Sequence, residues 1–163
     1  MTAFLGTVGV GLGLVGAIGG AAPLVMALSL RRSEHHRRVF WWVGTMTAGC
    51  VIAVLAMEVG LLTDNFSMQY VAANSTRATP WLYKVATLWG ALEGSLLLWA
   101  LVLSGYVAAV SISFRRRIED RLVAWALLTM LAVCVFFFGL LAAPADPFGT
   151  LLVAPLDGDC LLY

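Results

Sequence analysis

Long apolar runs alternate with short polar segments along this chain. Four runs, at residues 3–30, 39–62, 95–114 and 122–143, consist almost entirely of hydrophobic and small residues. Crossing about 30 Å of hydrocarbon takes roughly 20 such residues in a helix. A helix also satisfies its own backbone polar groups, which lipid cannot do. The pattern predicts an all-α integral membrane protein, a single domain over residues 1–163 with four transmembrane helices.

The composition supports this fold class. Hydrophobic residues make up 61% of the 163 residues and charged residues only 12%. Soluble domains contain roughly half apolar and a quarter charged residues. A signal peptide does not fit the first run, because no Lys or Arg precedes it and it is too long. We therefore interpret this run as a transmembrane helix that remains in the protein.

The positions of arginine and lysine predict how the helices are oriented. Of ten such residues, only Arg77 and Lys84 lie outside two short loops. These loops contain Arg31, Arg32, Arg37 and Arg38, and then Arg115, Arg116, Arg117 and Arg121. Because cytoplasmic loops are enriched in Arg and Lys, both are predicted to face the cytoplasm. The N-terminus, the loop at 63–94 and the tail at 144–163 are then predicted to lie on the outer side.

A further helix is predicted within the loop at 63–94. Thr79 and Pro80 are typical of an N-cap followed by proline at the first helical position. Apolar side chains then recur at helical spacing, at Trp81, Val85, Leu88 and Leu92, with Lys84 away from this stripe. The pattern indicates an amphipathic helix at the membrane interface. The alternative is an outward extension of the next transmembrane helix, but Gly90 and Gly94 favour a break.

Glycines in the first apolar run indicate close helix packing. Gly9, Gly13, Gly16 and Gly20 recur on one side of a helix and include two GxxxG patterns. Small residues at this spacing let a neighbouring backbone approach closely. A face that lines a cofactor is the less favoured alternative.

Glu58 and three cysteines are the other candidates for chemistry. A carboxylate inside a membrane helix is a functional candidate by default. Glu58 lies about one turn from the end of its run, so extension of its side chain to water is an equally good interpretation. Cys50 and Cys134 are interpreted as small apolar core residues. Cys160 is an unpaired thiol in the tail.

The two histidines do not predict a metal or haem site. His35 and His36 are the only histidines in the sequence, and they are adjacent in a charged loop. Neighbouring positions on a helix do not face the same way, so the pair does not form a ligand set. No CxxC motif or other metal-ligand spacing occurs, and we predict no metal site.

The polar segments together carry a family resemblance. The loop contains Asp64, Phe66, Tyr70, Ser75, Pro80, Lys84, Gly90, Gly94, Ser95 and Trp99, and the tail adds Asp146-Pro147-Phe148 and Pro155 through Gly158. In this order they resemble the CcmF/CcsA-type haem lyases of cytochrome c biogenesis, including the related haem lyase of nitrite reductase assembly. The chain is similar to the N-terminal four-helix part of such a protein.

The resemblance implies a function in cytochrome c maturation. Complete family members take haem from the chaperone CcmE and ligate it to apocytochrome c on the outer face of the bacterial inner membrane. Their W-G-x-x-W-x-W-D segment and their haem-binding histidines are not found in this sequence. We therefore expect no catalytic residue and no axial haem ligand here, and no activity of the chain alone. Its expected partners are the remaining haem lyase segments, CcmE, apocytochrome c and membrane lipid.

Four residues are candidates for an outer-face surface that contacts haem or a partner. They are Trp81, Tyr83, Trp89 and Glu93, chosen because aromatic side chains provide flat stacking area. Anchoring at the membrane interface explains the aromatic residues equally well. The alternative function is a structural or transport subunit of another membrane complex, in which this loop docks a partner.

Overall fold

The computed structural model describes residues 1–30, 36–117 and 120–158, and they form six helices. These are α1 (Thr2–Leu30), α2 (His36–Leu62), α3 (Gln69–Asn74), α4 (Trp81–Thr87), α5 (Leu92–Ser113) and α6 (Arg121–Ala142). The predictions for Arg31, Arg32, His35 and Cys160 concern positions outside the described residues.

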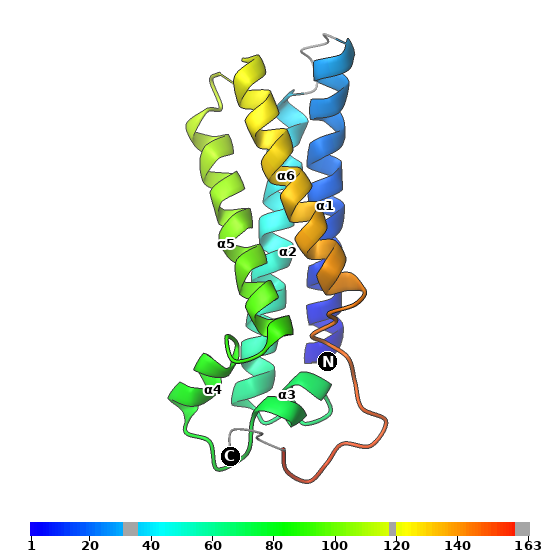
Figure 1. Ribbon diagram of the computed structural model, residues 1–163, viewed down its shortest axis with the longest axis vertical. Helices are drawn as coiled ribbons and strands as arrows, with labels where there is room; N and C mark the ends of the chain where they lie inside the picture. Colours follow the sequence, from blue (N-terminus) through cyan, green and yellow to red (C-terminus); the bar gives the residue numbers. More distant parts are fainter. Residues whose placement is uncertain (31–35, 118–119, 159–163) are drawn as a thin grey trace.

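Four long helices form an upright bundle, as Figure 1 shows. Each of α1, α2, α5 and α6 is long and apolar enough to cross a membrane, which confirms the predicted fold class. Around the bundle, α1 packs against α2 and α6, and α5 packs against the same two helices. α5 begins at Leu92, three residues before the predicted start of that span.

The polar segments gather at one end of the bundle. α3, α4, the start of α1 and the described part of the tail lie together there (Figure 1). The end of α1, the start of α2, the end of α5 and the start of α6 lie at the opposite end. All the arginines that the structure describes, except Arg77, are therefore at that opposite end.

The glycines of α1 allow close contact with two different helices. A Cβ at Gly9 would lie 2.7 Å from the carbonyl oxygen of Gly49, and one at Gly16 would lie 2.5 Å from the nitrogen of Met46, both on α2. A Cβ at Gly13 would collide with the ring of Phe138 on α6. The glycines thus permit packing, as predicted, but they divide between two neighbouring helices.

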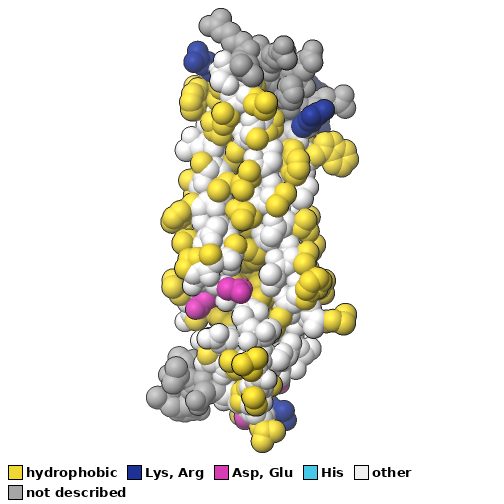
Figure 2. Space-filling view, turned by 90° about the vertical axis from the view of Figure 1, so that its right-hand side faces the viewer, with side chains coloured by type: hydrophobic (Ala, Val, Ile, Leu, Met, Phe, Trp, Pro, Cys, Tyr) yellow, Lys and Arg dark blue, Asp and Glu magenta, His cyan; other side chains and the backbone are white. Residues whose placement is uncertain are grey.

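The bundle has an apolar interior and an apolar outer surface. Cys50 and Cys134 are buried in the core, as predicted. Buried Ser104 and Ser111 donate hydrogen bonds to carbonyl groups of their own helix, at 2.9 and 2.8 Å. Hydrophobic side chains also cover the outside along its length, with Lys and Arg toward the two ends (Figure 2). This distribution is typical of a lipid-facing bundle.

Candidate functional site: the cap at the loop end of the bundle

Residues 63–91 and 143–158 fold together over one end of the bundle, and we call this unit the cap. It contains the two short helices α3 and α4 and most residues of the family resemblance. Its buried side chains include Phe66, Met68, Tyr70, Val71, Leu88 and Phe148. The cap therefore has an apolar interior that continues the bundle core.

The tail pairs with the segment before α3. The N–H of Gln69 donates to the carbonyl oxygen of Gly149 at 2.8 Å, and the N–H of Leu151 donates to that of Ser67 at 2.9 Å. Met68 and Thr150 thereby form an antiparallel bridge. The tail is thus joined to the loop by backbone hydrogen bonds, which do not depend on side-chain identity.

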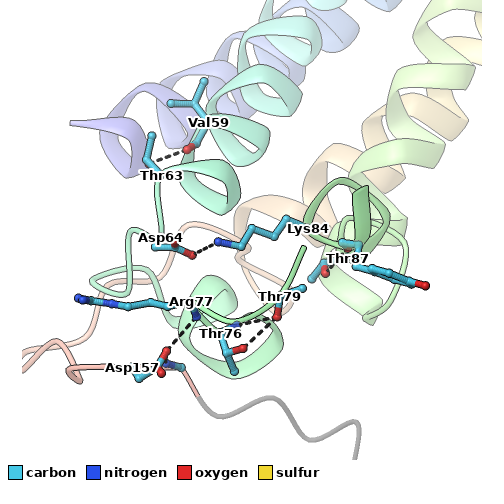
Figure 3. A network of polar contacts seen from close by, with 11 residues as sticks. Val59, Thr63, Asp64, Thr76, Arg77, Thr79, Lys84, Thr87 and Asp157 are labelled. Carbon is cyan, nitrogen blue, oxygen red and sulfur yellow. Dashed lines mark hydrogen bonds and ion pairs between the residues drawn. The ribbon is translucent and has the colours of Figure 1, made fainter. Parts of the chain in front are cut away.

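Asp157 joins the tail to the segment that follows α3. Its Oδ1 accepts a 3.0 Å hydrogen bond from the N–H of Arg77, as Figure 3 shows. The backbone N–H groups of Arg77 and Gly158 hold the pKa of Asp157 below its ordinary value. Gly158 fits directly beside the carbonyl oxygen of Ser75, where a Cβ would collide.

The N-terminus of α1 is also part of this unit. Asn65 Nδ2 donates to Thr2 Oγ1 at 2.8 Å, and Ser67 Oγ donates to Asn65 Oδ1 at 2.6 Å. The ring of Phe148 lies against Gly6, so close that a Cβ there would collide. The loop, the tail and the start of α1 are therefore joined by contacts that the sequence did not predict.

An ion pair fixes α4 to the end of α2. Asp64 lies two residues after the end of α2 and has a positive φ of 54°, a conformation that Asp adopts more readily than most residues. Its Oδ1 lies 2.5 Å from Lys84 Nζ (Figure 3), and the two side chains are 27% and 8% exposed. Lys84 is thus buried in the cap beside Asp64. The carboxylate supplies the opposite charge that a buried ammonium group needs.

The outward face of α4 is apolar. Trp81, Leu82 and Tyr83 are 66%, 62% and 68% exposed. The predicted stripe of apolar side chains is not continuous: Leu88 is buried, whereas Trp81 and Leu92 are exposed. The helix ends at Thr87, and a separate helix begins at Leu92. This break, which Gly90 favours, turns the members of the stripe in different directions.

The start of α4 also differs from the prediction. Pro80 precedes the first helical residue, Trp81, instead of occupying the first helical position. Thr79 does not cap the helix with its side chain, because its Oγ1 lies 2.9 Å from Thr76 Oγ1 and accepts from the Thr76 N–H (Figure 3). The hydroxyl is thus used to close the preceding turn.

Tyr70 joins α3 to the far end of α4. Its hydroxyl donates to the carbonyl oxygen of Thr87 at 2.8 Å. Burial, and the nearby carboxylates of Glu93 and Glu58, raise the pKa of Tyr70 to about 12. Gly94 lies beneath the tyrosine hydroxyl, where a Cβ would collide. The sequence predicts that Gly94 favours a helix break. In the structure Gly94 lies inside α5, where it packs against Tyr70.

A polar cavity of about 370 Å³ lies between α3, the start of α5 and the tail. Its polar lining residues are Gln69, Tyr70, Asn74, Glu93 and Asp146. Acidic side chains interrupt the apolar surface on the lower part of the bundle (Figure 2). The half-buried Glu58 lies close to Tyr70, and its Oε2 has no hydrogen-bond partner among the described residues.

The four predicted surface residues do not form one site. Glu93 is half-buried at the cavity, whereas Trp81 and Tyr83 are exposed on α4 and do not line it. Trp89 is 60% exposed in the break between α4 and α5. The cap therefore separates an apolar face on α4 from a polar cavity beside α5.

The cap does not resemble a haem or metal site. Protein ligands to haem iron are typically His, Met, Cys or Tyr. Met68 is completely buried and Tyr70 is bonded to Thr87, so both are engaged within the fold. In residues 1–30, 36–117 and 120–158, no group of three His, Cys, Asp or Glu is placed to hold a metal ion.

Most residues of the family resemblance are structural parts of the cap. Phe66, Tyr70, Ser75, Lys84 and Gly94 are buried, Asp64 and Ser95 are half-buried, and Pro80, Gly90 and Trp99 are exposed. Buried family residues usually reflect packing more than chemistry. The residues that carry the resemblance are therefore mainly residues that build the cap.

Comparisons with known proteins identify the family. No family model matches the chain. The cytochrome c-type biogenesis protein CcmF of Pseudomonas aeruginosa is 45% identical over 115 residues, covering 67% of this chain. CcmF of Escherichia coli is 39% identical over 122 residues, covering 74% of this chain. A solved structure described as the cytochrome c haem lyase CcmF matches 93% of this chain with a TM-score of 0.82 and 32% identity. The chain belongs to the CcmF family.

The chain spans only part of these CcmF proteins. It covers 17% of the Pseudomonas aeruginosa protein, 18% of the Escherichia coli protein and 25% of the solved CcmF chain. The match to the solved structure includes nearly the whole of this chain, and thus the cap as well as the bundle. The bundle and cap are therefore a unit of CcmF architecture.

Proposed function

We propose that this chain is a membrane component of CcmF-type cytochrome c maturation. In this proposal it supports haem delivery and ligation to apocytochrome c on the outer face of the bacterial cytoplasmic membrane. The observation that carries the proposal is the match of 93% of the chain to a CcmF haem lyase at a TM-score of 0.82. The cap would face outward, because the arginines gather at the opposite end of the bundle.

The proposed contribution of the chain is support for haem handling, and not catalysis. The cap is a packed unit whose polar groups are largely bonded to one another. The haem-binding histidines would come from the remaining haem lyase segments, and haem from the chaperone CcmE. Among the described residues, Trp89 and Glu93 make no side-chain hydrogen bond, and they are the proposed contact with haem or a partner.

Complementation tests this proposal. The chain would be expressed with the remaining part of a CcmF relative in a bacterium that lacks its own CcmF. The expected results are covalent haem staining of a reporter c-type cytochrome and co-purification of the two parts. The matched control expresses the remaining part alone and should give no stained cytochrome. Equal staining without this chain, together with no co-purification, would instead favour a subunit of another membrane complex.

A further inference from the structure

The polarity of α4 is reversed relative to an ordinary surface helix. Its lysine is buried in the cap, whereas the three consecutive residues Trp81, Leu82 and Tyr83 spread over the rest of the helix circumference and are more than 60% exposed. A surface helix of a soluble protein would turn these apolar side chains inward and the charge to water. Contiguous exposed apolar surface is typical of a protein or membrane contact.

This apolar face is separated by only a few residues from the start of α5, whose outer side chains are also apolar. α5 has 22 residues and is therefore about 33 Å long, close to the thickness of the hydrocarbon layer. Leu92 at its first position and Trp99 further along are 68% and 58% exposed. α4 precedes Leu92 by only a short break, so its face lies just beyond the hydrocarbon edge. Trp and Tyr are enriched at this depth of a bilayer.

Two contacts fix the depth and rotation of α4. The Asp64–Lys84 ion pair joins the middle of the helix to the end of α2. The hydroxyl of Tyr70 donates to the carbonyl oxygen of Thr87 at the other end of α4. Because Lys84 is held on the inner side, the outward face carries no charged group that would be costly to place against lipid.

We propose that the outward face of α4 lies in the headgroup region of the bilayer at the loop end of the bundle. Trp81, Leu82 and Tyr83 are the residues in contact with lipid, and the Asp64–Lys84 ion pair keeps them turned toward it. The placement of α4 depends only on the bilayer, so it stands or fails separately from the function in cytochrome c maturation.

Lipid quenching of a site-specific fluorophore tests this placement. Leu82→Cys and the matched control Ala78→Cys are each made with Cys160→Ser, labelled with an NBD fluorophore and placed in phosphatidylcholine nanodiscs. Ala78 is also exposed in the cap but lies before α4, and Cys50 and Cys134 are buried. A nitroxide on the lipid headgroup should quench position 82 at least threefold more than position 78. Aqueous iodide should show the opposite preference.

Equal quenching of both positions by lipid and by iodide would overturn the placement. It would mean that the α4 face lies in water, where a protein partner could cover it.

The function of the ion pair is tested in the Leu82→Cys background. Asn tolerates a positive φ, so Asp64→Asn removes the charge while keeping the backbone conformation. Lys84 then has to reach water, and lipid quenching at position 82 should fall to the level of position 78. The double variant Asp64→Asn/Lys84→Met leaves an apolar side chain in the same place and should restore strong quenching. Unchanged quenching in Asp64→Asn would overturn the proposed function of the pair.

Discussion

At the scale of single residues, Lys84 shows that residue type alone does not decide burial. Its side chain is only 8% exposed beside Asp64. From the sequence, this lysine was a polar position away from an apolar stripe. Its partner lies 20 positions earlier in the chain, beyond the reach of a helical periodicity. The same limit applies to Gly94, whose contact with Tyr70 crosses from one helix to another.

Gly94 and Gly105 form a matched pair of glycines within α5. We expect Gly94→Ala to lower the free energy of unfolding by about 1–3 kcal/mol, because the new Cβ displaces Tyr70 and the carbonyl of Leu88. Gly105 has open space around it, so Gly105→Ala should be neutral or stabilising by about 0.5–1 kcal/mol. Thermal unfolding of both variants in the same detergent measures the difference. Equal midpoints would contradict the packing assigned to Gly94.

Asp157 should make the tail contact sensitive to acid. Its pKa is lowered in the folded protein. The ionised carboxylate therefore stabilises the contact between tail and loop above the ordinary carboxylate pKa, and this stabilisation is lost as the pH falls through the lower folded pKa. The N–H of Arg77 should then lose protection from hydrogen exchange after correction for intrinsic rates. Asp157→Ala should remove that protection at every pH. The N–H of Gln69 is the internal control, because it donates to a backbone carbonyl.

At the scale of elements, the glycines of α1 determine how closely the helices pack. Sequence spacing placed them on one side of the helix and predicted a packing function. The structure adds that Gly9 and Gly16 contact α2, whereas Gly13 contacts α6. Spacing along one helix cannot distinguish one neighbour from two, because the positions of the neighbours depend on the whole bundle.

Gly16 and Gly11 test this packing within one helix. Gly16 lies against the backbone of Met46, whereas at Gly11 a Cβ would have no neighbour within 4 Å. We expect Gly16→Leu to separate α1 from α2 and to lower the thermal unfolding midpoint strongly, by roughly 5 °C or more. Gly11→Leu should leave it within a few degrees, because its side chain meets lipid. A similar loss in both variants would contradict the packing assigned to Gly16.

At the scale of the whole molecule, the proposed function is one in which the bundle and cap would support haem handling without supplying haem ligands. Met68 and Tyr70 are engaged within the cap. His36 begins α2 at the other end of the bundle, and His35 lies outside the described residues. The family resemblance rests on residues of the cap and of the start of α5, and the comparisons confirm it.

The purified chain alone should bind haem weakly. We expect no stoichiometric Soret band after addition of haem in detergent and removal of the excess on a desalting column, because residues 63–91 and 143–158 of the cap include no histidine that could be an axial ligand. Absorbance near the Soret region, relative to protein concentration, is the measurement. One tightly bound haem per chain would contradict this expectation.

The sequence by itself determined the four membrane helices, the family, and the position of the polar segments at the same end of the bundle. These properties depend on local hydropathy, on charge and on motifs within short stretches of chain. Only the tertiary structure showed that the start of α1, the loop and the tail form one cap, and that α4 turns its lysine inward. The Asn65–Thr2 and Arg77–Asp157 hydrogen bonds join residues 63 and 80 positions apart. Such contacts form only because the packed helices bring distant segments together. No local pattern in the sequence contains this information.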